Sequence, residues 1–364
     1  MALINQLEET STGEALARWL DDKLDGQVEV TDVVVPKESG MSMSTVLFKA
    51  SVAGTDYDLV ARVAPAGSGL FEPDLEREFG VLALVGAQGV TVPKVRWLEQ
   101  DASVLGAPFL VMDRIDGQVP GDDPPFTMDA DGWVLALAPE QRGTLWSEAI
   151  RVMAGVHAVD AKEAGSIHGL DPDAAGIDAQ LAAWERYYRW TCGEGRTSAV
   201  VDGGFAWLRE HRPATDGDPV LNWGDARLGN IIYGPDQQAV AALDWELTTI
   251  AEPGFDLGWF VLFIRFYGEA MGVAIPDGMP TREEVVAQYE EVSGRTAQNI
   301  DWWEAFAAVR LAAMFVRMGT MMVESGALPP DNQMWVNNPS SHMLSALLDL
   351  PAPDGESSNF IGNR

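Results

Sequence analysis

The sequence contains little cysteine and little histidine. A single cysteine, Cys192, excludes an intramolecular disulfide framework and favours a reducing compartment. The four histidines show no zinc-ligand spacing, which argues against a structural zinc site. The amino terminus carries Glu8 and Glu9 and lacks the basic-then-apolar pattern of a secretory signal, so we expect a cytoplasmic protein.

Positive charge is also scarce. The 24 Lys and Arg residues face 55 Asp and Glu residues, which gives a formal net charge of −31. Such a chain is repelled by phosphate polymers and by anionic membrane surfaces, so neither nucleic acid nor a membrane is expected as a partner. The excess of acid either favours a cationic substrate or serves solubility alone.

Long apolar runs without a charge are missing as well. The stretches 255–275 and 300–323 are long enough to span a bilayer, but Arg265, Glu269, Arg310 and Arg317 interrupt them. We interpret both as buried helices. The 47% hydrophobic and 22% charged fractions are those of a folded protein, and 364 residues suffice for two domains that share a cleft.

Residues 1–113 show the pattern of a small β-rich unit. A helix is predicted to begin at a capping box formed by Ser11 and Glu14 and to end at Gly26. Three β-rich runs then predict an antiparallel meander, and a helix with two further strands completes a five-stranded layer. These elements cover 28–35, 45–52, 57–64, 74–88, 94–99 and 108–115.

Helical patterns dominate beyond a turn-rich stretch at 121–125, and short strands return only within 219–247. We therefore predict an α+β, bilobal fold. Its small antiparallel-sheet lobe covers 1–113, with a hinge near 110–116, and its larger, mainly helical lobe covers 114–350 before a flexible tail over 351–364. The predicted helices lie at 140–159, 176–190, 198–211, 255–271, 281–293, 301–323 and 339–349.

The polar residues that carry chemistry lie around a predicted hairpin. Two short apolar strands, 231–233 and 240–243, flank a turn. Asn230 enters the first strand and Asp244 leaves the second, so both side chains can face the same point. Asp225 lies in the loop five residues before Asn230.

These residue types suit phosphoryl transfer, which needs a carboxylate to orient the attacking hydroxyl and hard oxygen ligands to hold magnesium against phosphates. Asp225 would supply the carboxylate that orients the hydroxyl, and Asn230 and Asp244 would supply the magnesium ligands. Arg227 is placed to neutralise charge on the transferred group. Loop capping is the alternative for Asp225 or Asn230 alone, but capping does not account for a second carboxylate after an apolar hairpin.

The segment 219–260 resembles the signature of the aminoglycoside phosphotransferase/choline kinase-like family. Gly224-Asp225, Asn230, Leu243–Glu246 and Asp256-Leu257 match its motifs. Residues 104–109 and 112–114 are similar to the branch attached to acyl-CoA dehydrogenases. The resemblance implies a protein-kinase-like fold with nucleotide between the lobes, and Asp256 as a support of the catalytic loop.

The resemblance also implies the activity and the nucleotide contacts. It implies magnesium-dependent transfer of the γ-phosphate of ATP or GTP to a hydroxyl of a small molecule. Arg62 occupies the place of the kinase lysine that binds phosphates, with Glu78 as its ion-pair partner, although a solvated strand residue is the alternative reading of Arg62. Further implied contacts are Ser42 and Ser44 of a glycine-poor loop and, at the hinge, Met112 and Arg114.

Departures from the family pattern leave alternatives open. Trp223 replaces the usual histidine and is expected to remove a polar partner of the catalytic loop. With Arg62 and the glycine-poor loop, it keeps open a catalytically silent nucleotide-binding module. The acceptor stays open among aminoglycosides, choline-like alcohols, sugars and hydroxyacyl thioesters, and so does the oligomeric state. Aromatic residues of the helical lobe are read either as core or as an acceptor pocket: Trp184, Tyr187, Tyr188, Trp190, Trp302, Trp303 and the segment 259–267.

Overall fold

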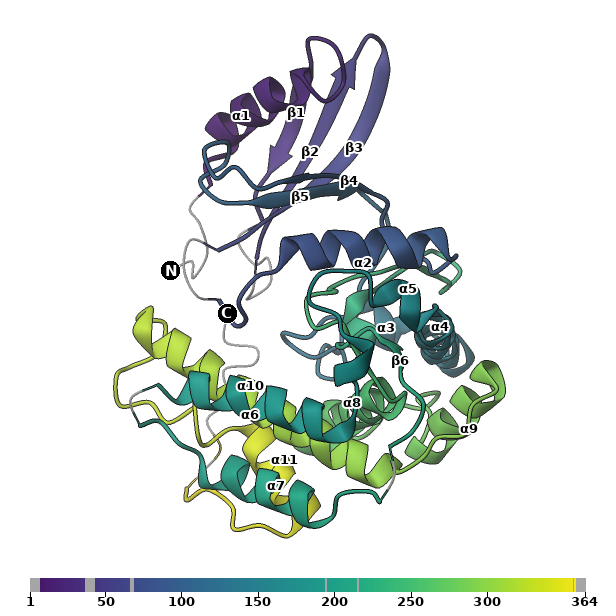
Figure 1. The fold of residues 1–364 in the computed structure, drawn as a ribbon, viewed down its shortest axis with the longest axis vertical. Coiled ribbons are helices and arrows are strands. Elements are labelled where there is room, and N and C mark those ends of the chain that lie inside the picture. The colour runs from purple at the N-terminus through teal and green to yellow at the C-terminus, as the bar shows by residue number, and fades with distance from the viewer. Residues whose placement is uncertain are drawn as a thin grey trace.

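The computed structural model describes residues 7–36, 43–65, 69–193, 195–214, 216–355 and 357. The chain forms a small lobe with one antiparallel sheet and a larger lobe built mainly of helices (Figure 1). The predicted α+β, bilobal fold is confirmed.

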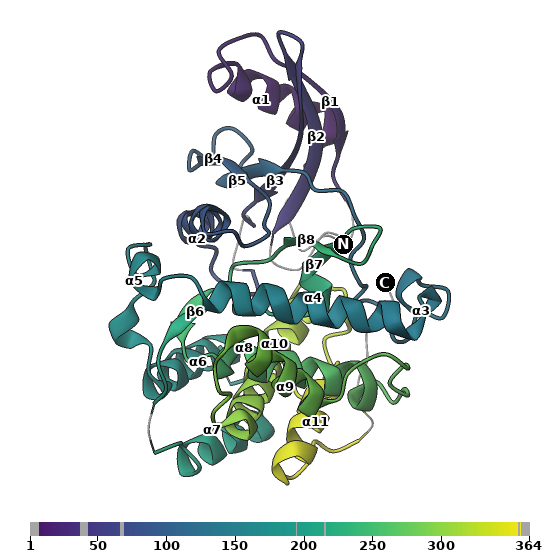
Figure 2. The same ribbon diagram turned by 90° about the vertical axis from the view of Figure 1, so that its right-hand side faces the viewer.

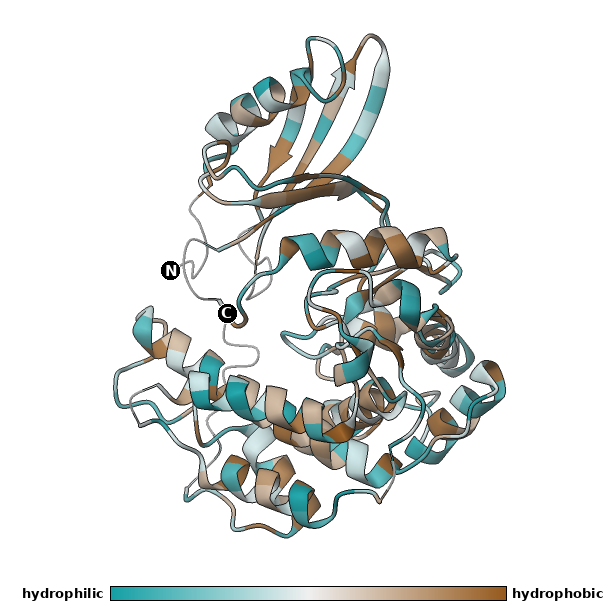
Figure 3. Cartoon of the chain, viewed as in Figure 1, coloured by the Kyte–Doolittle hydropathy of each residue, from teal (hydrophilic) through white to brown (hydrophobic). Residues whose placement is uncertain are grey.

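The sheet of the small lobe has the strand order β1-β2-β3-β5-β4, and every neighbouring pair is antiparallel. Buried and less buried positions alternate along most of β2 and along the second half of β3, as expected for a sheet with one covered face. Figure 3 shows that both strands carry hydrophobic and hydrophilic residues. Helix α1 packs on the sheet and shares its core. The bounds are α1 Glu9–Asp21, β1 Glu29–Val34, β2 Ser44–Val52, β3 Thr55–Val63, β4 Val95–Glu99 and β5 Phe109–Asp113.

The start of α1 differs from the prediction. The helix begins at Glu9, with Glu8 at the N-cap and no side-chain cap. The Ser11 hydroxyl lies inside the first turn and donates to the Glu8 carbonyl at 3.2 Å. The capping box with Glu14 is therefore wrong, because the chain enters the helix two residues before the serine.

Helix α2, Leu75–Ala87, connects the two lobes (Figure 1 and Figure 2). Leu75 and Phe79 pack with the core of the small lobe, as predicted for a helix on the sheet. Val81, Leu82 and Val85 belong instead to the core of the larger lobe. The helix thus carries Glu78 on a surface that both lobes share.

The larger lobe is a helical body in which α8 and α10 form the centre. By length and composition α10 could cross a membrane, but most of its apolar stretch is buried inside the protein, which confirms the reading of 300–323 as a buried helix. The bounds are α3 Trp133–Ala136, α4 Pro139–His157, α5 Ala161–Ala164, α6 Ile177–Cys192, α7 Ala199–Glu210, α8 Gly254–Arg265, α9 Arg282–Ser293, α10 Ile300–Glu324 and α11 Pro339–Leu348.

Two small β ladders lie in the larger lobe. The predicted hairpin is confirmed as β7, Ile231–Tyr233, paired with β8, Ala239–Ala242. A second ladder, absent from the predictions, joins β6, Val220–Asn222, to β9, Thr249–Ala251. The polar loop, residues 223–230, runs from β6 of one ladder to β7 of the other. Of the predicted tail, residues 351–355 and 357 are described and form no helix or strand.

Candidate active site

The loop between β6 and β7 is held by Asp256 of α8. Its carboxylate accepts the backbone N–H groups of Trp223 at 2.6 Å and of Gly224 at 2.8 Å. His157 of α4 lies 3.2 Å from the same carboxylate. These contacts confirm that Asp256 supports the loop that carries Asp225.

Gly224 is required by the backbone at this point. Its φ is +95°, a conformation that favours glycine, and a Cβ there would lie 2.1 Å from the carbonyl oxygen of Leu247. No other residue type fits without moving the segment after β8. The sharp turn places Asp225, the next residue, at the end of the loop.

Hydrogen-bond donors surround the carboxylate of Asp225. Trp259 Nε1 donates to Oδ1 at 2.6 Å, Asn230 Nδ2 donates to Oδ2 at 2.7 Å, and Arg227 Nε lies 3.0 and 3.1 Å from the two oxygens. These donors fix the side chain in one orientation. Such fixed geometry is what a group that orients a hydroxyl needs.

Arg227 has a second carboxylate partner that the sequence did not point to. Its Nη1 donates to Asp122, which also accepts the Tyr267 hydroxyl at 2.8 Å. Burial would lower the pKa of Arg227, but Asp122 and Asp225 raise it well above its usual value. The guanidinium therefore joins the Asp225 loop to the stretch after the hinge. In this arrangement its charge is already neutralised, so contact with a phosphoryl group stays a prediction.

Trp223 keeps a polar contact where its loss was expected. Its indole Nε1 donates to the Leu243 carbonyl at 2.8 Å, and its ring stacks on Trp245 at a centroid distance of 5.6 Å. The indole therefore connects the loop that carries Asp225 to the residue before Asp244. The expectation that tryptophan removes a polar partner is wrong for this reason.

Asn230 and Asp244 lie at the open end of the β7–β8 hairpin. The Leu243 N–H donates to the Asn230 carbonyl at 2.8 Å, which extends the ladder by one step. Asp244 has a φ of +61°, a left-handed conformation that is uncommon outside glycine and that turns the chain sharply after the strand.

These residues fit a magnesium ion by their donor chemistry. An amide and a carboxylate, both with hard oxygen donors, lie on adjacent strand ends, and Mg²⁺ is commonly held by one or two carboxylates together with substrate phosphates. Within the described residues no group of three His, Cys, Asp or Glu side chains could hold a metal alone. The remaining ligands would have to come from nucleotide and water.

Arg62 of β3 connects the lobes. Its Nε lies 3.5 Å from Glu78 Oε1, and its Nη2 donates to Asp244 Oδ1 at 3.2 Å. Burial raises the pKa of Glu78, which Arg62 only partly offsets. Burial alone would lower the pKa of Arg62, but Glu78 and Asp244 hold it above its usual value. The predicted pair of Arg62 and Glu78 is present, and the solvated-strand reading of Arg62 does not hold.

The structure describes three of the four other predicted nucleotide contacts. Ser42 lies outside the described residues, and Ser44 is buried at the start of β2, opposite Val63. Met112 is buried within β5, and the Arg114 N–H donates to the Asp58 carbonyl at 2.9 Å. This N–H is therefore engaged by the sheet of the small lobe, and contact of Met112 or Arg114 with a nucleotide stays a prediction.

A cavity of about 470 Å³ opens beside the site, between the start of α2, helix α6 and the segment after Asp244. Trp184, Tyr187 and Trp190 of α6 form one wall, so three of the aromatic candidates line a pocket. Trp184 also belongs to the core of the larger lobe, together with Tyr188, Trp259, Trp302 and Trp303. The cavity also contains charges of both signs, from Glu72, Arg77, Arg186 and Glu246.

The bilobal fold and the Asp-Asn-Asp arrangement place the protein in the class of kinase-like phosphotransferases. The chain belongs to the phosphotransferase enzyme family, whose sequence pattern matches residues 33–303.

Curated relatives and solved structures also match the chain. Acyl-CoA dehydrogenase family member 10 of Mus musculus is 28% identical over 271 residues, which cover 71% of this chain and 24% of that protein. The chain spans about a quarter to a third of the length of the curated relatives it matches. A Ralstonia eutropha protein classed as an aminoglycoside phosphotransferase superposes with a TM-score of 0.66 at 25% identity, covering 92% of this chain and 95% of that one.

A more distant neighbour shows the same fold with ligands. A thermostable aminoglycoside phosphotransferase in a ternary complex with AMP-PNP and hygromycin B superposes with a TM-score of 0.56 at 14% identity, covering 92% of this chain and 98% of that one.

Proposed function

We propose that the protein transfers the γ-phosphate of ATP or GTP to a hydroxyl group of a small molecule, with Mg²⁺. The observation that carries the proposal is the fixed carboxylate of Asp225, bonded to Asn230 at 2.7 Å beside the strand end that carries Asp244. Loop capping alone would not require these three residues to converge beside an Arg62–Glu78 pair from the other lobe.

In the proposed reaction the acceptor oxygen forms a bond to the γ-phosphorus while the bond to the bridging β–γ oxygen breaks. Asp225 orients the acceptor hydroxyl and receives its proton. Arg62 faces the phosphates from the small lobe. Asn230 and Asp244 would hold Mg²⁺, which neutralises charge on the phosphates when it is bound. The nucleoside diphosphate is the leaving group.

The proposal is tested by a transfer assay with ATP or GTP, Mg²⁺ and a panel of hydroxyl compounds. The panel contains aminoglycosides, choline-like alcohols, sugars and hydroxyacyl thioesters, the last because a relative is named an acyl-CoA dehydrogenase family member. Formation of a phosphorylated acceptor supports the proposal. Nucleotide binding without transfer to any member supports the silent module instead, for which the contact between Arg62 and Asp244 is the favouring observation.

Replacing Arg62 with alanine is expected to weaken triphosphate binding about ten- to hundredfold and adenosine binding much less. A charge-assisted contact is worth about 1.5–3 kcal/mol, and only the phosphates make it. Lysine should restore part of the affinity, because a point charge replaces a planar fork. Calorimetric titration with both ligands measures the difference.

The control for this variant addresses the buried partner. Arg62→Ala leaves Glu78 without its cation, so the double variant Arg62→Ala/Glu78→Gln separates loss of stability from loss of phosphate binding. If the variant binds triphosphate and adenosine each with wild-type affinity, the phosphates are bound by residues other than Arg62.

The cavity beside α6 is our candidate for the acceptor site, since its volume is within the range of small-molecule pockets. Trp190 is 37% exposed there, so its loss should leave the fold intact. We expect Trp190→Ala to raise the acceptor KM about tenfold and to leave nucleotide affinity unchanged. Trp207→Ala, on α7 and outside the cavity, is the matched control, and an unchanged KM would exclude this wall.

A further inference from the structure

Arg310 of α10 is completely buried, although the sequence marked it only as an interruption of an apolar run. Its guanidinium carbon lies 3.9 Å from the ring centre of Phe255, 4.5 Å from that of Trp259 and 4.6 Å from that of Trp184. Its Nη2 donates to the Gly224 carbonyl at 2.8 Å. Nε and Nη1 have no hydrogen-bond partner within the described part of the chain.

A buried guanidinium is costly unless its surroundings compensate for the lost hydration. Three aromatic faces do so in part, since a cation is attracted to the face of a ring. Burial lowers the pKa of Arg310 to about 9, while Asp256 and Asp225 oppose this, so the group is charged at neutral pH. An apolar side chain would fill the space without that cost, so packing alone does not explain the arginine.

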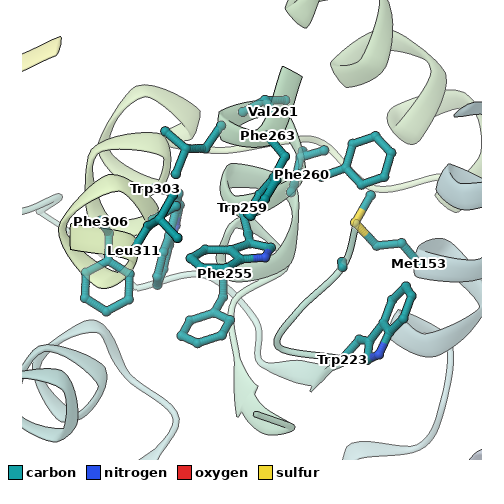
Figure 4. Close-up of a cluster of buried hydrophobic side chains, with 14 of the residues drawn as sticks. Met153, Trp223, Phe255, Trp259, Phe260, Val261, Phe263, Trp303, Phe306 and Leu311 are labelled. Carbon is teal, nitrogen blue, oxygen red and sulfur yellow. The ribbon is translucent and has the colours of Figure 1, made fainter. Parts of the chain in front are cut away.

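The contacts of Arg310 converge on Asp225. Gly224 precedes Asp225, and this glycine is held on both sides, its N–H by Asp256 and its carbonyl by Arg310. Trp259, whose ring faces the guanidinium, donates its indole N–H to Asp225 Oδ1 at 2.6 Å. Figure 4 shows Trp259 and Phe255 together on the helix beside the one that carries Trp303 and Phe306.

We propose that Arg310 is a positioning residue that holds Gly224 and Trp259 so that the Asp225 carboxylate keeps its orientation toward the acceptor hydroxyl. This inference rests on the proposed function. The same guanidinium contacts Trp184 and Phe255, which line the cavity beside α6. One buried cation therefore contacts both the support of Asp225 and the wall of the candidate acceptor site.

The test uses Arg310→Met and Arg310→Lys in the full chain. Exchange of the Trp259 indole proton, assigned with Trp259→Phe, is followed by NMR, with the indole of Trp302 as internal reference because it donates to the Leu208 carbonyl. We expect Trp259 exchange to accelerate at least about tenfold in Arg310→Met and Trp302 exchange to stay unchanged. The kcat should fall about ten- to hundredfold with nucleotide affinity within about twofold, because a small misplacement of the catalytic group is costly.

Two variants make the result decisive. Arg310→Lys keeps the charge and most of the stem but lacks the planar fork. Its Trp259 exchange rate and kcat should therefore lie between those of the wild type and those expected for Arg310→Met. This variant carries the test if Arg310→Met does not fold. Arg317→Met removes an arginine of the same helix that stacks on Trp190, and should leave Trp259 exchange unchanged.

Unchanged Trp259 exchange, or unchanged kcat, in a folded Arg310 variant would overturn the inference. If the wild type transfers phosphate to no acceptor, the proposed function fails, and the exchange of the Trp259 indole still reports whether Arg310 holds the loop.

Discussion

Asp225→Asn is expected to lower kcat by about 10²–10⁴-fold, the range that a positioned general base contributes. The amide keeps the size of the carboxylate and one acceptor oxygen, so the loop held by Asp256 should keep its shape. Nucleotide binding should persist, because Asp225 acts on the acceptor hydroxyl. In this variant a turnover assay should show the loss of kcat, while calorimetric titration should show unchanged nucleotide affinity.

The amide nitrogen introduced by this substitution would face one of the donors that now surround the carboxylate, which costs about 1 kcal/mol for a lost hydrogen bond. Asp236→Asn, in the exposed turn of the β7–β8 hairpin, is the matched control. Turnover at the wild-type rate in Asp225→Asn would remove Asp225 from the mechanism.

The fold was predictable because its signals are local. The β-rich runs that form β2 and β3 and the apolar spacing in α2 depend on neighbouring residues only. The β7–β8 hairpin was predictable for the same reason, and it placed Asn230 and Asp244 on adjacent strand ends. The spacing of Asp225, Asn230 and Asp244 along one loop and one hairpin was therefore enough to predict the centre of the candidate site.

The supports of the site were not predictable, since each depends on contacts between distant segments. Asp122 meets Arg227 across 105 residues, and Arg310 meets Gly224 across 86. Neither pair has a spacing that a sequence pattern can show. For Arg310 a signal was present, a charge inside an apolar helix, but its partners came only from the packing of α8 against α10.

The role of Trp223 was misread for a similar reason. A tryptophan at a histidine position suggests a lost polar contact, yet the indole N–H reaches the Leu243 carbonyl, and His157 reaches Asp256 from α4. The loop that carries Asp225 therefore has polar support from α4, from α8 and from the residue after β8. The substitution is weaker evidence for a silent module than the sequence suggested.

Asp244→Ala is expected to abolish the effect of Mg²⁺ on nucleotide affinity and to lower kcat by about 10²–10³-fold. Charge stabilisation by a metal is worth several kcal/mol in the transition state, and each 1.36 kcal/mol is about tenfold in rate. Asn230 is left as the single proposed protein ligand and carries no charge. Titrations with nucleotide, with and without Mg²⁺, measure the first effect.

The contact between Asp244 and Arg62 predicts a second effect of this substitution, on nucleotide affinity in the absence of Mg²⁺. Without the carboxylate, the Arg62 guanidinium keeps Glu78 as its ion-pair partner and can turn its Nη2 toward phosphates. Nucleotide affinity without Mg²⁺ should therefore hold or rise while the Mg²⁺-dependent part is lost. Asp236→Ala should change neither. A Mg²⁺ effect of wild-type size in Asp244→Ala would mean that the metal is held elsewhere.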